Sequence, residues 1–383
     1  METSSQINEI NRISNPEVMK TPVFSLSHEE EHELVSLMLR ARDNTWGDAN
    51  SDIGKKINNY FKLNQLPNEV KNFLEKYRNG NKNDLDAETI YNLALGLDNH
   101  TRNRNVFDML AKYKNVEKAE EAQQQLSDAI QSIKSILPSE LIEDMEAHAK
   151  NDTDKRESLL PKYKKNLNSL ISFFRPSPST SPVKTITLMN SDLILSKKSG
   201  AAFSLGEELV ISSHVDNPDN INHEFLHSVI NPIVEKISSK LSNEQKQKII
   251  DMASRDLKYG QEYGEDHFSL LCEELIRTYN DIYRKNEAPI SYEKFIGEAD
   301  KLDEKKFDKI LQEKESFAEK CEQLNVRTFE EFKAKRQEYF DAYHKNELRD
   351  RIFEMYKEYD DARTNDPSLN FENYIRNNYD ELI

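Results

Sequence analysis

Two histidines four residues apart, with a glutamate directly after the first, have the types and spacing best suited to chemistry. They are His223, Glu224 and His227, in the string HEFLH. On a helix, positions i and i+4 share one face, so two neutral imidazoles there can bind one zinc ion. Glu224 lies about 100° around such a helix, where it can act on a metal-bound water without binding the metal. The motif predicts a zinc-dependent peptidase.

The same pattern occurs a second time, as HEEEH at residues 28–32. The two residues before its second histidine, Glu30 and Glu31, are both charged. In a metal-binding helix these positions normally hold uncharged residues, because they lie on the buried face opposite the metal. No strand is expected before it, and acidic side chains suit the dipole at a helix start. We interpret residues 28–32 as the solvated first turn of a helix that begins near Ser27.

The flanks of the HEFLH copy favour a helix that presents its histidines to a cleft. Asn217 suits the cap, Pro218 the first helical position, and Asp219 follows in the first turn. His223 and His227 project to one edge of the apolar stripe rather than from its centre. The stripe consists of Ile221, Phe225, Leu226, Val229 and Ile233.

Zinc needs a third protein ligand. The metzincin pattern requires Gly and His three and six residues after the second histidine, and this sequence has Ile230 and Ile233 there. A glutamate from a later predicted helix, residues 265–285, is the remaining common source. We prefer Glu273 and keep Glu274 in reserve. The alternative that both are surface charges stays open.

Residues near Glu273 have weaker assignments. Arg277, four residues further on, can hydrogen-bond to the Glu273 carboxylate and orient it. Cys272 is interpreted as a small buried hydrophobe rather than a ligand. His267 is a candidate ligand, a transition-state donor, or a histidine of the helix cap.

The composition limits the partners and the compartment. Lys and Arg number 53 against 69 Asp and Glu, giving a net charge of −16, and no basic patch is found. Nucleic acid and anionic membranes are therefore not expected as partners. With two cysteines, no signal peptide and no apolar run of 18 residues, a cytoplasmic protein is expected, although secretion without a signal remains open.

The expected fold is mainly α with a small β-sheet (α+β). Strands are expected at 183–189, 193–195, 201–205 and 209–212, and this is the only strand-rich region. Upstream, helices at 139–149 and 159–174 are expected to be separated by a loop. The predicted segments are a flexible N-terminus at 1–22, a helical region at 23–175, a Pro/Ser linker at 176–182, a zincin-like catalytic core at 183–300 and a helical C-terminal region at 301–383.

HEFLHSVINP, preceded by short strands and followed by a helix containing CEELIR, resembles a family of uncharacterised bacterial proteins described as zinc metallopeptidases. These proteins are gluzincin-like, with HExxH and a downstream glutamate. The resemblance implies a zincin-type domain with His223, His227 and Glu273 as zinc ligands and Glu224 as the base. Thermolysin-like gluzincins have an aspartate where this chain has Arg277, so the support for a zinc-binding histidine must come from elsewhere.

The expected activity is hydrolysis of peptide bonds in a peptide or protein substrate. Such enzymes often place a tyrosine before the ligand glutamate, which makes Tyr263 the first candidate for stabilising the oxyanion and His267 the second. The alternative is a non-catalytic helical interaction module with a degenerate or structural zinc site. The sequence leaves the oligomeric state open.

Overall fold

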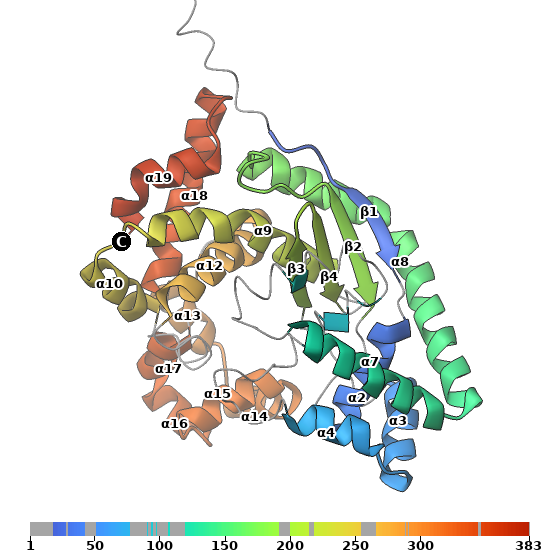
Figure 1. The fold of residues 1–383 in the computed structure, drawn as a ribbon. Coiled ribbons are helices and arrows are strands. Elements are labelled where there is room, and N and C mark those ends of the chain that lie inside the picture. Colours follow the sequence, from blue (N-terminus) through green and yellow to red (C-terminus); the bar gives the residue numbers. More distant parts are fainter. Residues whose placement is uncertain are drawn as a thin grey trace, which may run out of the picture. The chain divides into compact units, whose positions relative to one another are not determined.

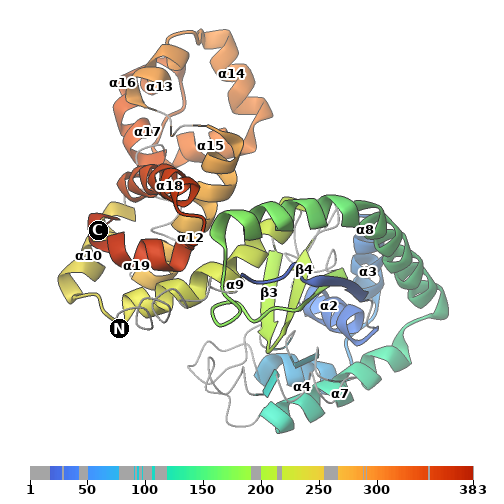
Figure 2. The same ribbon diagram turned by 90° about the horizontal axis from the view of Figure 1, so that it is seen from above.

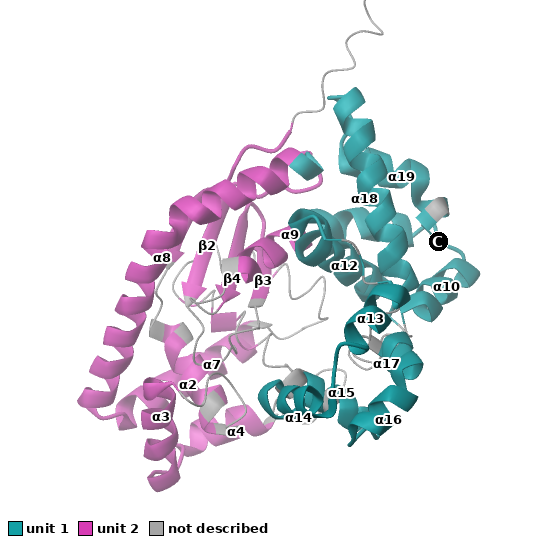
Figure 3. Cartoon of the chain, turned by 180° about the vertical axis from the view of Figure 1, so that it is seen from behind, with its two compact units in different colours: residues 1–16, 173–176, 229–383 teal, residues 17–172, 177–228 magenta. Residues whose placement is uncertain are grey.

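The computed structural model describes most of the chain, and its described part is mainly α with a small mixed sheet, as expected (Figures 1 and 2). The described residues are 18–27, 30–42, 51–76, 90, 93–94, 97, 106–107, 119–190, 200–213, 218–253, 266–287, 289, 291–343 and 346–382. The chain divides into two compact units (Figure 3). Phe173–Pro176 and Val229–Ile383 belong to unit 1, and Glu17–Ser172 and Ser177–Ser228 to unit 2.

The sheet lies in unit 2 and has the strand order β1-β2-β4-β3. Its strands are β1 (Val23–Ser27), β2 (Thr185–Asn190), β3 (Gly200–Leu205) and β4 (Glu208–Ser213). β2 is parallel to both β1 and β4, and β3 is antiparallel to β4. β4 is buried along nearly its whole length, as suits an inner strand covered on both faces.

β1 corrects two expectations. The strands were all expected after Pro182, yet one edge strand comes from the N-terminal part of the chain. A strand also precedes residues 28–32, where none was expected, because β1 ends at Ser27 and α2 begins at Glu30. The expected strand at 193–195 lies outside the described residues.

One face of the sheet packs on four helices of unit 2. These are α2 (Glu30–Arg42), α3 (Asp52–Leu63), α4 (Asn68–Lys76) and α7 (Ala119–Ile136). Phe203, Val210 and Met189 from three neighbouring strands join Leu37 and Leu126 in one hydrophobic core. Alternate strand residues point to one face, so these strand positions are expected to share it.

α8 (Ser139–Phe174) lies along the sheet and is a single helix (Figure 1). The loop expected between 149 and 159 is therefore wrong. Arg156 is 2% exposed, and its Nη2 donates to the Ser213 carbonyl at the end of β4. The centroid of the Tyr163 ring lies 6.4 Å from that of Phe24 on β1. These contacts with the sheet stabilise a stretch whose own helix propensity is low.

Unit 1 packs its longer helices around an aromatic core. Its elements include α10 (Asn243–Ala253), α12 (His267–Arg277), a π-helix (Thr278–Ile282), α18 (Glu347–Asn365) and α19 (Phe371–Leu382). Tyr279 of the π-helix lies 4.7 Å from Phe173 and 4.7 Å from Phe174, centroid to centroid. Tyr356 of α18 lies 5.6 Å from Tyr279. These ring contacts hold the π-helix, which follows α12 directly in the chain.

A second core in unit 1 lies in the chain between α12 and α18. The helices are α13 (Tyr292–Ala299), α14 (Glu304–Glu313), α15 (Glu315–Gln323), α16 (Phe329–Ala334) and α17 (Arg336–Tyr343). Phe307, Cys321 and Phe332 are at its centre, each 2% exposed or less. This segment therefore packs around its own apolar side chains.

Candidate metal centre

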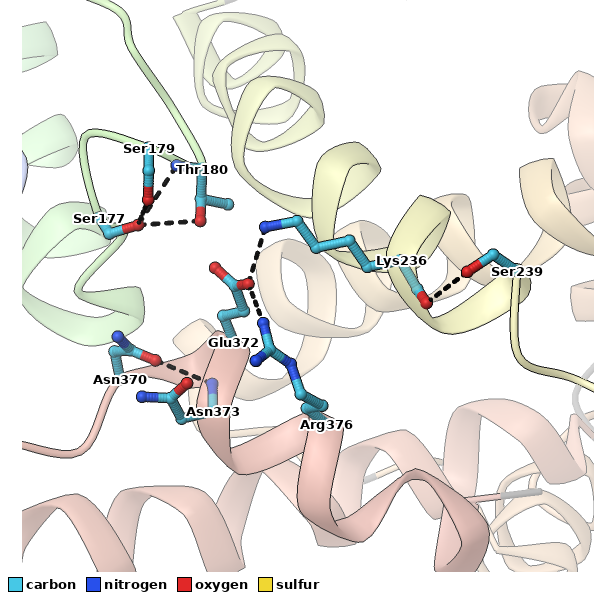
Figure 4. Close-up of polar contacts among 9 residues, drawn as sticks. All are labelled: Ser177, Ser179, Thr180, Lys236, Ser239, Asn370, Glu372, Asn373 and Arg376. Carbon is cyan, nitrogen blue, oxygen red and sulfur yellow. Dashed lines mark hydrogen bonds and ion pairs between the residues drawn. The ribbon is translucent and has the colours of Figure 1, made fainter.

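The histidine motif lies on α9 (Pro218–Ser238), which begins at Pro218 with Asp219 in its first turn, as predicted. Asn217, the predicted cap, is outside the described residues. Pro232 lies inside the helix and has no N–H to donate to the Ser228 carbonyl. Further along, Lys236 Nζ lies 2.8 Å from Glu372 Oε1 on α19, and Arg376 pairs with the same carboxylate (Figure 4). These ion pairs hold the second half of α9 in unit 1.

The predicted helix phase is confirmed by burial. The five stripe residues are each 2% exposed or less. His223 and His227 are only partly buried, whereas Glu224 is 7% exposed. A carboxylate is seldom buried to this extent unless it has a structural or chemical role.

His223 and His227 meet through their Nε2 atoms, which lie 3.2 Å apart. The ring centroids are 4.9 Å apart and the planes are inclined by 76°. Two nitrogens at about 2.0–2.1 Å from zinc with a tetrahedral angle lie about 3.3–3.4 Å apart. The pair thus has nearly the separation that a shared zinc ion requires.

Glu273 lies on α12, which is capped and buried. Asp266 caps it, accepting from Phe268 N at 3.0 Å and from Ser269 Oγ at 2.6 Å. Every residue from 270 to 276 is buried, and Glu273 is 9% exposed. Arg277 Nε donates to Glu273 Oε2 over 2.7 Å, which confirms the hydrogen bond expected from their spacing.

Glu274 has a different environment. Its side chain is 1% exposed, and both of its oxygens accept hydrogen bonds from α18 or its cap. Arg349 donates from Nε to Oε2 at 3.1 Å and from Nη2 to Oε1 at 3.0 Å, and Asn346 Nδ2 donates to Oε1 at 3.0 Å. The neighbouring glutamates thus differ: Glu274 is held by α18, and Glu273 by Arg277 on its own helix.

In the described part of the chain, His223, His227 and Glu273 form a group suited to a metal ion. One ligand atom from each lies within 4.8 Å of the others. Two imidazole nitrogens and a carboxylate oxygen are a ligand set of catalytic zinc sites, which keep a fourth position open. The donor chemistry and the histidine separation therefore fit zinc.

The two candidates for the oxyanion donor are not in this group. Tyr263 lies outside the described residues. His267 is the first residue of α12, and burial together with the nearby Lys246 charge lowers its pKa. His267 is therefore biased towards the neutral imidazole.

Arg349 and Asn346 are the residues that sequence reasoning missed. Asn346 had a local signal, because Asn is a favoured N-cap and Asn346 directly precedes α18. Arg349 had no such signal, since its partner lies 75 positions earlier in the chain.

No protein-family model matches the chain, and no curated protein or solved structure is significantly similar to it. The resemblance to gluzincin-like metallopeptidases therefore stays a prediction. None of the described helices is both long and apolar enough to cross a lipid bilayer.

Proposed function

We propose that the protein is a zinc-dependent metallopeptidase in which His223, His227 and Glu273 bind the metal and Glu224 transfers protons. The observation that carries this proposal is the proximity of the three ligand atoms, all within 4.8 Å of one another. The intact HExxH spacing supports it, because it places a glutamate beside the first ligand.

Bound zinc would polarise the scissile carbonyl and lower the pKa of a coordinated water. Glu224 directly follows a ligand on α9, so it lies beside the site without belonging to the ligand set. Its carboxylate would accept a proton from the attacking water and pass it to the leaving amine. Arg277 would hold one Glu273 oxygen and thereby orient that carboxylate.

The proposed substrate is a peptide or protein, and a cytoplasmic location is part of the proposal. The strong net negative charge supports the view that nucleic acid is not a substrate. The alternative is a helical interaction module that binds a structural metal ion or none, and such a protein would not cleave peptides.

The test combines metal analysis with peptide cleavage. Protein purified without chelators should hold about one zinc ion per chain and cleave members of a mixed peptide library, detected by mass spectrometry. Glu224→Gln should keep the metal and lower cleavage about 10²–10⁴-fold, the usual contribution of a general base.

Glu235→Gln is the matched control, because Glu235 is an exposed carboxylate of the same helix. It should cleave like the wild type. Undiminished cleavage by Glu224→Gln would refute the role of that residue. Zinc without any cleavage would favour the interaction module, and a wild type without zinc would refute the proposed metal site.

A further inference from the structure

Glu274 is a buried carboxylate next to the proposed ligand Glu273, and it needs partners. At 1% exposure it has lost almost all of its water. A carboxylate in such a place remains ionised only if charged or polar donors replace the water. Its partners come from residues 72 and 75 positions later in the chain.

Arg349 holds Glu274 with two donors in the fork arrangement. Nε and Nη2 each donate to one oxygen, at 3.1 and 3.0 Å, and the Arg349 side chain is itself 20% exposed. Such bidentate pairs fix direction as well as distance, because both partners are planar. Glu274 is therefore held in orientation and not merely neutralised.

Asn346 ties the same carboxylate to the start of α18. Its Oδ1 accepts from Arg349 N at 2.9 Å as the helix cap, while its Nδ2 donates to Glu274. About two turns after Arg349 on α18, Tyr356 donates its hydroxyl to the Leu275 carbonyl at 2.9 Å. α18 and its cap thus hold two consecutive residues of α12, one by its side chain and one by its backbone.

We propose that Arg349 and Asn346 are positioning residues of the metal centre, which fix the rotation of α12 and thereby aim Glu273. The inference rests on the metal-binding part of the proposed function. Consecutive side chains project from a helix in directions about 100° apart around its axis, so holding the Glu274 side chain also sets the direction of the Glu273 side chain.

A metal site requires its ligands to be placed precisely, so the rotation of α12 about its axis must be fixed. A carboxylate about 5–6 Å from the helix axis moves about 2 Å when the helix rotates by about 20°. Metal–ligand distances tolerate deviations of only about 0.2 Å. Arg277 cannot supply this control alone, because it lies on the same helix and rotates together with Glu273.

The test measures metal affinity rather than peptide cleavage. Arg349→Lys keeps the charge and loses the fork, and Glu274→Gln keeps the shape and loses the charge. Zinc affinity by chelator competition, the cobalt(II) absorption spectrum and thermal unfolding without metal are compared with the wild type. Both variants should bind zinc about 10–100-fold more weakly, with an altered cobalt spectrum while still folded.

Arg351→Lys is the matched control, since Arg351 lies on α18 and pairs at 2.8 Å with Glu347, with side chains 35% and 41% exposed. It should leave all three measurements unchanged. If both variants lower the unfolding temperature but bind metal like the wild type, the residues are structural only and the inference is overturned. Should Arg349→Lys fail to fold, Glu274→Gln decides alone.

The same experiment separates this inference from the proposed function. A wild type that binds zinc but cleaves no peptide refutes the peptidase and leaves the positioning role to be decided by the variants. A wild type that binds no zinc overturns both.

Discussion

Arg277 and Glu273 are joined across one turn of α12 by a hydrogen bond of 2.7 Å from Nε to Oε2. Both side chains are largely buried, at 20% and 11% exposure, so solvent screens this ion pair less than a surface pair. The partner of Arg277 is thus Glu273, the glutamate that we propose as a metal ligand.

Replacing Arg277 should weaken metal binding. Arg277→Lys keeps the charge but loses the planar donor, so the Glu273 carboxylate becomes less well oriented and zinc affinity should fall about tenfold. Arg351→Lys is the control, because Arg351 also pairs with a glutamate one turn away, Glu347, but on α18. Equal zinc affinities in Arg277→Lys and the wild type would contradict the assigned role, as would an equal loss in the control.

Replacing either motif histidine should abolish the stabilisation that zinc provides. At zinc concentrations about 100 times Kd, the wild type should gain about 2.7 kcal/mol in its free energy of unfolding. His223→Ala and His227→Ala should lose most of this gain, as followed by thermal unfolding with and without zinc. His267→Ala should keep it, since His267 is not in the ligand group. A loss in that variant would place His267 among the ligands.

Both cysteines should be unreactive in the folded protein. Burial raises the pKa of the Cys321 thiol to about 11 and that of Cys272 well above its usual range. The thiolate is the reactive form, so at pH 8 little of either is available. A thiol-specific chromogenic reagent should modify neither residue until denaturant is added and should then modify both. Rapid reaction of the native protein would show that one of these sites opens.

Alkali should destabilise the aromatic core of unit 1. Burial raises the pKa of Tyr279 from 10.0 to about 12. Between these values only the unfolded chain releases the proton, so stability present below pH 10 is lost as pH rises towards 12. The full loss is on the order of 3 kcal/mol, and about half of it should be present at pH 11, as measured by urea unfolding at pH 8, 10 and 11. Tyr279→Phe should show a shallower decline, and an equally steep one would contradict this cause.

Local signals were sufficient to predict where α9 begins and that His223 and His227 lie at the edge of its apolar stripe. Pro218 and the apolar stripe are local features, and helix geometry converts them directly into burial. The Arg277–Glu273 bond was predictable for the same reason, because a spacing of four is contact distance on any helix.

The errors arose where distant contacts override local preference. VFSLS at residues 23–27 lies far from the strand-rich region in the sequence, and it becomes a strand by pairing with β2, more than 150 residues later. The stretch between Ala149 and Leu159 looks like a loop, yet Arg156 is buried against Ser213 and keeps α8 continuous. Glu273 and Glu274 could not be distinguished by environment, since the difference depends on Arg349.

The insertion of α13–α17 between α12 and α18 has a consequence for the order of folding. The Glu274–Arg349 contact closes a loop of 75 residues, and closure of a long flexible loop is entropically costly. The intervening helices have their own core, so they can collapse early and bring the ends of the loop close together. We therefore expect the contact between α12 and α18 to form late, so that Glu273 acquires its final direction only near the end of folding.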